Sequence, residues 1–163
     1  MLNLISKYTL AILVACSLMF QTRPVFAQEG IEYPRAEERA RQDTDRVIDA
    51  QVRSIFAGLS KLQAESVLLA YEPRYAIGTD TLPTSQEILQ VRVLIRKILT
   101  ELFESETAEK VTVLYGGSVK SSFLPAVSYE AGMQGVLVGR ESLFPYEIVK
   151  MMNILEDYGV SAD

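Results

Sequence analysis

The chain has 163 residues, a length that fits one domain, and 48% hydrophobic with 23% charged residues is typical of a globular protein rather than a disordered or fibrous one. A formal net charge of −5 offers no basic surface for nucleic acid. Because histidine is absent and Cys16 is the single cysteine, the chain supplies no Ser–His–Asp triad, His-based metal site, intrachain disulfide or thiolate zinc cluster.

The N-terminal segment, residues 1–27, has several interpretations. Lys7, an uncharged run over residues 8–20 and Val25-Phe26-Ala27 follow the pattern of a secretory signal peptide. The run is shorter than the ~20 apolar residues of a membrane-spanning helix. "LVAC" also resembles a lipoprotein signal, which would make Cys16 a lipid attachment site. Alternatively, "LAILVAC" or "PVFA" is a buried strand, or the segment belongs to no native fold. We therefore divide the chain into a signal-like or non-native segment, 1–27, and a domain, 28–163.

The first predicted helix begins near Ala36, and its apolar residues recur at helical spacing up to Leu59. Gly58 and Ser60 mark its end. "SVLLAY", residues 66–71, predicts a strand buried on both faces, and a loop follows over residues 73–83.

The clearest helix covers residues 84–103, where Thr84 and Glu87 form a capping box. Its apolar stripe is Ile88, Val91, Ile95, Ile98, Leu99 and Leu102.

The remaining elements are a strand over 111–115, a broken helix over 119–132 that contains Pro125, a strand over 135–139 and a helix over 144–159. Pro145 lies near the start of this last helix, and Gly159 is its expected C-cap.

Short buried strands that alternate with helices predict an α/β fold of parallel β/α units with right-handed crossovers. Chemistry in such folds collects at the carboxyl ends of the strands. Those ends carry Glu72, "YGGS" (115–118) and "VGR" (138–140), so we expect all three on one face.

Each strand end has a possible chemical role. Glu72 suits general-base work, although a structural Glu paired with an Arg is the alternative. The turn up to Ser118 directs backbone N–H groups at an anion, or is a plain tight turn. Gly139 and Arg140 add N–H groups and a guanidinium, and Gly78 adds a loop N–H. Together these residues indicate a small phosphorylated substrate that is held at one end and deprotonated at the other.

Three blocks of the sequence, "AYEPRYAIGT", "LYGGSVK" and "GVLVGRESL", resemble the signature blocks of triosephosphate isomerase, in the same order and at matching spacing. The resemblance runs from about residue 36 to the C-terminus. It implies a partial TIM (β/α)8 barrel, about the last four β/α units. It also implies interconversion of dihydroxyacetone phosphate and glyceraldehyde 3-phosphate, as in glycolysis and gluconeogenesis, without a cofactor or metal.

The resemblance assigns roles to individual residues. Glu72 corresponds to the base that moves a proton between adjacent carbons, within the family's general scheme of a Glu base and lid closure. The substrate phosphate would be bound by Gly78, Ser118, Gly139 and Arg140. The lid would consist of Pro73, Arg74, Tyr75, Ala76, Ile77, Gly78 and Thr79.

The sequence also departs from the family pattern. Tyr75 stands where many members have Trp, Asp80 replaces a common lid Gly, and Arg140 replaces a second Gly. If the position of Arg140 needs a positive φ, its backbone is strained there. The half of the barrel that supplies the family's Asn, Lys and electrophilic His is not represented in the sequence.

Such a half barrel, with three strands and a fourth near the N-terminus, has two open parallel edges and an uncovered apolar interior. We therefore expect a homodimer or a complementing N-terminal half as partner, and negligible isomerase activity for residues 28–163 alone. The alternative function is a non-catalytic exported or partner-binding fragment that binds a phosphate-bearing ligand. The resemblance implies a cytoplasmic location, and a genuine signal in residues 1–27 implies export.

Overall fold

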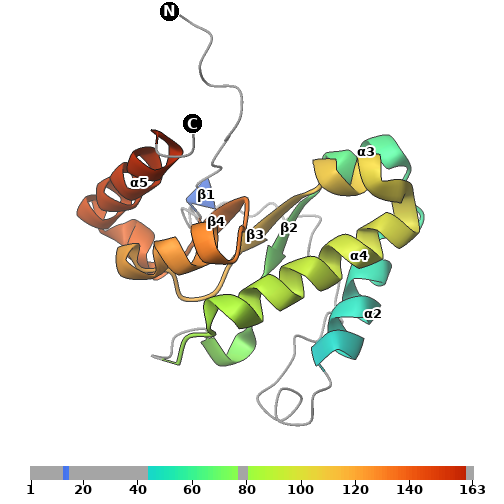
Figure 1. Ribbon diagram of the computed structural model, residues 1–163, viewed down its shortest axis with the longest axis horizontal. Coiled ribbons are helices and arrows are strands. Elements are labelled where there is room, and N and C mark those ends of the chain that lie inside the picture. The colour runs from blue at the N-terminus through green and yellow to red at the C-terminus, as the bar shows by residue number, and fades with distance from the viewer. Residues whose placement is uncertain (1–12, 15–43, 77–80, 161–163) are drawn as a thin grey trace, which may run out of the picture.

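The computed structural model describes residues 13–14, 44–76 and 81–160, and within these ranges four strands form one parallel sheet (Figure 1). The spatial order of the strands is β1-β4-β3-β2. The predicted α/β class with parallel β/α units is confirmed. The strands are β1 (Leu13–Val14), β2 (Leu68–Tyr71), β3 (Thr112–Tyr115) and β4 (Gly135–Val138). The α-helices are α2 (Thr44–Phe56), α3 (Lys61–Glu65), α4 (Ser85–Lys110) and α5 (Pro145–Val160).

The N-terminal segment contributes strand β1, which pairs with β4 through Leu13 opposite Leu137 and Val14 opposite Val138. Strand β1 lies inside the "LAILVAC" run, so this part of the chain follows the strand interpretation. The rest of residues 1–27, the predicted start of the first helix near Ala36 and the predicted lid residues 77–79 lie outside the described residues. In the described part, no helix is both long and apolar enough to cross a bilayer.

The sheet has a helix-covered face and an inner face. Leu69, Val113 and Val136 point to the helices and join the main core, whose helical side comes from α2, α4 and α5. Successive residues of a strand point to opposite faces, so Leu68 and Leu114 lie on the inner face. The Leu68 residue is 49% exposed. The prediction that β2 is buried on both faces is therefore wrong, because the described residues leave the inner face open at this edge.

Helix α2 ends at Phe56, close to the end predicted at Gly58 and Ser60, and a separate short helix, α3, follows it. Gly58 adopts φ 77° just after α2, in the left-handed region that favours glycine. Ser60 then caps α3 through the Gln63 N–H, and the Gln63 side chain accepts from the Ser60 N–H at 2.9 Å. The sequence analysis missed this short helix.

Helix α4 starts at the predicted capping box, since the Glu87 N–H donates to the Thr84 hydroxyl at 3.2 Å and the Thr84 N–H donates to Glu87 at 2.8 Å. The predicted apolar stripe is buried except at Leu102, which is 36% exposed. Phe103 is buried instead, because its ring packs edge-on against Phe56 of α2 with centroids 5.7 Å apart.

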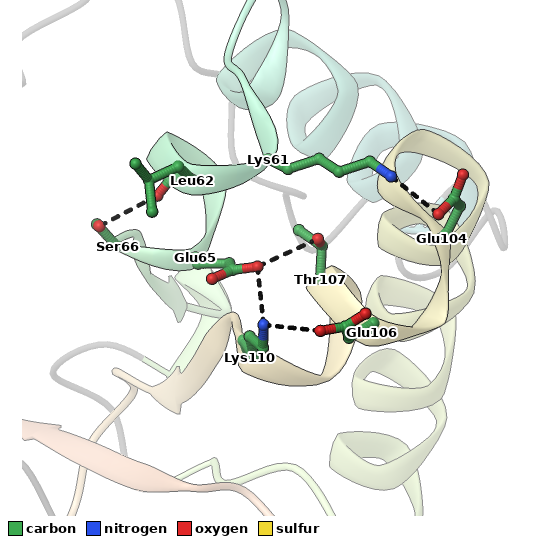
Figure 2. A network of polar contacts seen from close by, with 8 residues as sticks. All are labelled: Lys61, Leu62, Glu65, Ser66, Glu104, Glu106, Thr107 and Lys110. Carbon is green, nitrogen blue, oxygen red and sulfur yellow. Dashed lines mark hydrogen bonds and ion pairs between the residues drawn. The ribbon is translucent and has the colours of Figure 1, made fainter.

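Helix α4 also extends beyond its predicted end, through a kink at Glu104 (φ 72°, ψ 165°). A non-glycine residue is strained in this backbone region. The kink residue and the helical turn after it are tied to α3 by polar contacts (Figure 2). Lys61 pairs with Glu104 at 2.8 Å, while Glu65 accepts from Thr107 at 3.3 Å and from Lys110 at 3.2 Å.

The C-terminal elements follow the prediction with two corrections. The broken helix consists of a 3-10 turn, η2 (Ser121–Phe123), and a π-helical turn, η3 (Ala126–Glu130), that begins directly after Pro125. Strand β4 ends at Val138 instead of Gly139. Gly159 is not the C-cap of α5, because the helix continues to Val160 and the positive-φ glycines of the described residues are Gly58 and Gly132.

Replacing Glu104 with Gly should stabilise the protein. Glycine removes the backbone strain, about 1 kcal/mol or more, whereas the lost ion pair with Lys61 joins two exposed side chains and contributes little. We expect the melting temperature of Glu104→Gly to rise by about 2–4 °C. Glu104→Ala is the matched control, because it loses the same ion pair and keeps the strain. A Gly variant that melts no higher than the Ala variant would contradict the strain argument.

Candidate active site

The carboxyl ends of β2 and β3 are adjacent at one rim of the sheet. The register pairs Tyr71 with Tyr115, and the Gly116 N–H donates to the Tyr71 carbonyl at 2.9 Å. Glu72 and the Gly116-Gly117 turn are thus the first residues beyond two neighbouring strands. Strand β4 is parallel to β3 and ends at Val138, so Gly139 leaves the sheet toward the same rim.

The Glu72 side chain lies directly against the backbone of Gly116. A Cβ atom at Gly116 would come within 2.6 Å of Glu72 Cγ and 2.9 Å of Glu72 Oε1. The space that the carboxylate occupies therefore exists because residue 116 has no side chain. Gly116 is a positioning residue that the sequence analysis identified only as part of a turn.

Glu72 is half-buried, and burial raises the pKa of its carboxyl group. The charged form loses hydration that no cation among the described residues replaces. The described residues therefore do not show the alternative, in which Glu72 is a structural residue paired with an Arg. A half-buried carboxyl with a raised pKa suits a base that must take up and release a proton.

The segment after Glu72 is held against the rim from two directions. Pro73 and Ala76 are buried, and the 3-10 turn η1 (Arg74–Ala76) closes through an Ala76 N–H bond to the Pro73 carbonyl at 2.8 Å. The Ser118 hydroxyl donates to the Ala76 carbonyl at 2.6 Å. The structure thus brings Ser118 and the first part of the predicted lid together, whereas Ile77, Gly78 and Thr79 lie outside the described residues.

An aromatic cluster that sequence reasoning missed lies beneath this segment. The ring of Tyr115 packs edge-on against Tyr71 and Phe123, with centroids 6.3 and 6.0 Å apart. Burial, with contributions from Tyr75, raises the pKa of both Tyr71 and Tyr115, and Tyr75 also hydrogen-bonds Tyr71. The sequence contained a sign of this aromatic cluster, because a tyrosine is the last residue of both β2 and β3.

Gly139 and Arg140 are exposed where β4 ends, and η4 (Arg140–Leu143) begins there. Arg140 is not strained, because the positive-φ non-glycine residue of the described part is Glu104. A Cβ at Gly139 would meet no atom within 4 Å. Arg140 therefore follows the end of β4 without backbone strain. Within the described ranges, no group of three or more His, Cys, Asp or Glu side chains could hold a metal ion.

These features define a class: a parallel β/α barrel segment with a half-buried carboxylate and glycine-containing turns at one rim. A family model described as triosephosphate isomerase matches residues 34–155. The chain belongs to the triosephosphate isomerase family.

Three relatives, each named triosephosphate isomerase, show the extent of the similarity. The chain is 38% identical over 117 residues to the one from Clostridium beijerinckii, which covers 72% of this chain and 47% of that protein. It is 39% identical over 117 residues to the one from Dictyoglomus thermophilum, which covers 70% of this chain and 47% of that protein. The chain is 41% identical over 107 residues to the one from Carboxydothermus hydrogenoformans, which covers 66% of this chain and 43% of that protein. The chain spans about half the length of the curated relatives it matches.

Replacing Gly116 with Ala should destabilise the protein by about 1–3 kcal/mol, because the new methyl group overlaps Glu72 Cγ. Denaturant unfolding measures the loss. The double variant Glu72→Ala/Gly116→Ala should recover most of it, since the clashing atoms are gone. Gln90→Ala, at an exposed position of α4, is the control. Equal losses in the single and double variants would show that Glu72 does not occupy this space.

Replacing Glu72 with Gln should stabilise the protein at pH 8 more than at pH 4. Burial raises the pKa of Glu72 in the folded state. The stability that its protonation adds is therefore fully present below the pKa of the unfolded state, ~4.3. This stability is lost as the pH rises through the pKa of the folded state. Gln keeps a neutral group at all pH values. Thermal melts of the variant at both pH values measure the difference. Glu130→Gln, at an exposed site, is the matched control, and equal effects of Glu72→Gln at both pH values would refute the desolvation argument.

Proposed function

We propose that the chain supplies the catalytic base and the phosphate-binding loops for interconversion of dihydroxyacetone phosphate and glyceraldehyde 3-phosphate. The observation behind this proposal is the half-buried Glu72 carboxylate, which lies against the backbone of Gly116. Ser118 follows in the turn at the end of the neighbouring strand β3. Membership of the triosephosphate isomerase family supports the choice of reaction.

In this reaction, the Glu72 carboxylate takes a proton from the carbon beside the substrate carbonyl. The hydroxyl proton on that carbon passes to the former carbonyl oxygen, and the enediolate accepts the first proton back at the adjacent carbon, so that ketose and aldose exchange with no net gain or loss of atoms. A base whose pKa is raised toward neutrality returns the proton more readily than an exposed carboxylate. Backbone N–H groups at Gly78, Ser118 and Gly139, with the Arg140 guanidinium, would hold the phosphate.

The lid proposal rests on the segment Pro73–Thr79. Its described half is fixed by the Ser118 bond to Ala76 and by buried Pro73. A segment anchored at one end can swing over a bound phosphate and exclude water, which would strengthen the electrostatic interactions of the enediolate.

The 163 residues contain no histidine. An imidazole electrophile for the enediolate is therefore not among the groups that they supply, and we propose that the chain alone is a poor isomerase. A second copy of the chain or a complementing N-terminal half is the proposed partner. We propose a cytoplasmic location from family membership, with export as the alternative if residues 1–27 are a signal peptide.

The second candidate function is non-catalytic binding of a phosphate-bearing ligand. The exposed Arg140 guanidinium at the rim favours it, because an added cation strengthens anion binding and is not needed for proton transfer. Glu72 favours isomerisation, because a carboxylate repels a phosphate that is merely bound.

The two functions are distinguished by incubating the purified chain with dihydroxyacetone phosphate in deuterated buffer. Isomerase-type chemistry predicts deuterium incorporation at the reacting carbon, detected by NMR, together with a turnover far below ~10 per second. Glu72→Gln should abolish the exchange, and Arg140→Ala should weaken substrate binding while exchange of bound substrate persists. Binding without exchange, even after addition of the N-terminal half of the Clostridium beijerinckii protein, would favour the non-catalytic function.

A further inference from the structure

Two arginines on one face of α4 lie against the segment that leads into β4. Arg92 and Arg96 are one helical turn apart, so their side chains project from the same face of the helix. The π-helical turn η3, which precedes β4 in the chain, contacts α4 (Figure 1). Arg96 donates to Gln134, the residue directly before β4. The pair therefore lies near the amino end of β4, the opposite end from Gly139 and the candidate active site.

The Arg96 guanidinium is fixed by two neutral oxygen atoms. It donates to the Ala108 carbonyl and, at 2.5 Å, to the side-chain oxygen of Gln134. Gln134 is exposed, whereas the Arg96 Nε is buried and has no hydrogen-bond partner among the described residues. Neither oxygen neutralises the charge. Because each terminal nitrogen of a guanidinium carries two hydrogens, each keeps one N–H for a further acceptor.

The Arg92 guanidinium lies against a glycine backbone. A Cβ atom at Gly132 would come within 3.4 Å of Arg92 Cζ and Nη1, so the missing side chain leaves room for the guanidinium. Gly132 adopts φ 66°, in the left-handed region that favours glycine. The Arg92 Nε is buried without a hydrogen-bond partner, and in the described part of the chain no carboxylate pairs with Arg92. Its position is thus set by packing and its charge has no local counterion there.

Burial distinguishes this pair from other cations that lack a hydrogen-bonded carboxylate among the described residues. Exposed cations of this kind, whose charges water solvates, are Lys97, Lys120, Arg140 and Lys150. Arg92 and Arg96 are half-buried. Burial lowers the pKa of Arg96, the charge of Glu109 opposes this shift, and the charge of Arg92 adds to it. Two neighbouring cations thus lose part of their hydration, a cost that a bound anion would offset.

We propose that Arg92 and Arg96 bind a phosphate group, from inorganic phosphate or from a phosphomonoester, near the amino end of β4. The oxygens of a tetrahedral phosphate can accept from two guanidinium groups at once, whereas one guanidinium already occupies both oxygens of a carboxylate. Because packing and hydrogen bonds fix the two side chains, little side-chain freedom is lost on binding. The site is separate from the candidate active site, so this inference does not depend on the proposed function.

The test is a titration of the full, isotope-labelled chain with inorganic phosphate at constant ionic strength, followed by NMR. The backbone amide signals of Gly132 and Gln134 should shift and reach saturation. Methyl phosphate is the second probe, and it distinguishes the two sources of the phosphate group. Tighter binding of methyl phosphate supports a phosphomonoester as the ligand, and tighter binding of inorganic phosphate supports the free ion.

A pair of variants tests the role of the guanidinium. Arg92→Gln should weaken phosphate binding about tenfold or more, because it removes the charge-assisted hydrogen bonds of one guanidinium. Lys97→Gln is the matched control, since it removes the same charge from an exposed position of α4. This control should change the affinity by less than about twofold, because salt screens an exposed charge. Equal weakening by the two variants would show a response to net charge alone and would overturn the proposal.

Other outcomes that overturn the proposal need no variant to fold. The first is a titration in which the Gly132 and Gln134 signals of the unchanged chain do not move. The second is acetate that gives the same saturable shifts at the same concentrations, because the site would then not select phosphate. The third is a set of shifts confined to Ser118 and Gly139, which would support phosphate binding at the candidate active site and count against this second site alone.

Discussion

The register between β2 and β3 is the constraint on which the candidate site depends. It brings the Gly116 backbone to the Tyr71 carbonyl at 2.9 Å and so places the first residues after both strands side by side. Because Gly116 has no Cβ, the Glu72 side chain folds over it and becomes half-buried. A register shift of one residue would turn Glu72 to the other face of the sheet. The position and the raised pKa of the carboxyl group therefore follow from backbone pairing.

Helix α4 helps to fix β3, one strand of this pair, against its other neighbour β4. Gln134, just before β4, acts as an extra pairing residue: its side-chain oxygen accepts from the Val113 N–H at 2.9 Å, and its own N–H donates to the Val113 carbonyl at 3.1 Å. Arg96 of α4 donates to the same Gln134 oxygen at 2.5 Å and also to the Ala108 carbonyl. Since buried polar groups are costly unless they are bonded, sliding of β3 against β4 would break several bonds at once.

Much of this arrangement could be predicted from the sequence, for identifiable reasons. Short apolar runs between helices predicted β2, β3 and β4, and parallel connection predicted that their ends share a rim. Helix α3 was missed because five residues are too few to show helical periodicity. The exposure of Leu68 was missed because an apolar run does not say which faces are covered. The Glu72–Gly116 contact and the Ser118 bond to Ala76 depend on side-chain positions, which a one-dimensional pattern does not contain.

The contrast among the glutamates supports the proposal that Glu72 belongs to a functional site. Glu104 is exposed and paired with Lys61, and this hydrogen bond lowers the pKa of its carboxyl group. Glu65 likewise binds Lys110, as expected for carboxylates that stabilise the surface. Burial alone raises the pKa of Glu72, and its side chain lies against the backbone of Gly116. A carboxylate whose desolvation no described cation offsets is consistent with the proposal that Glu72 faces a ligand, and backbone N–H groups of the adjoining turns would suit the phosphate of that ligand.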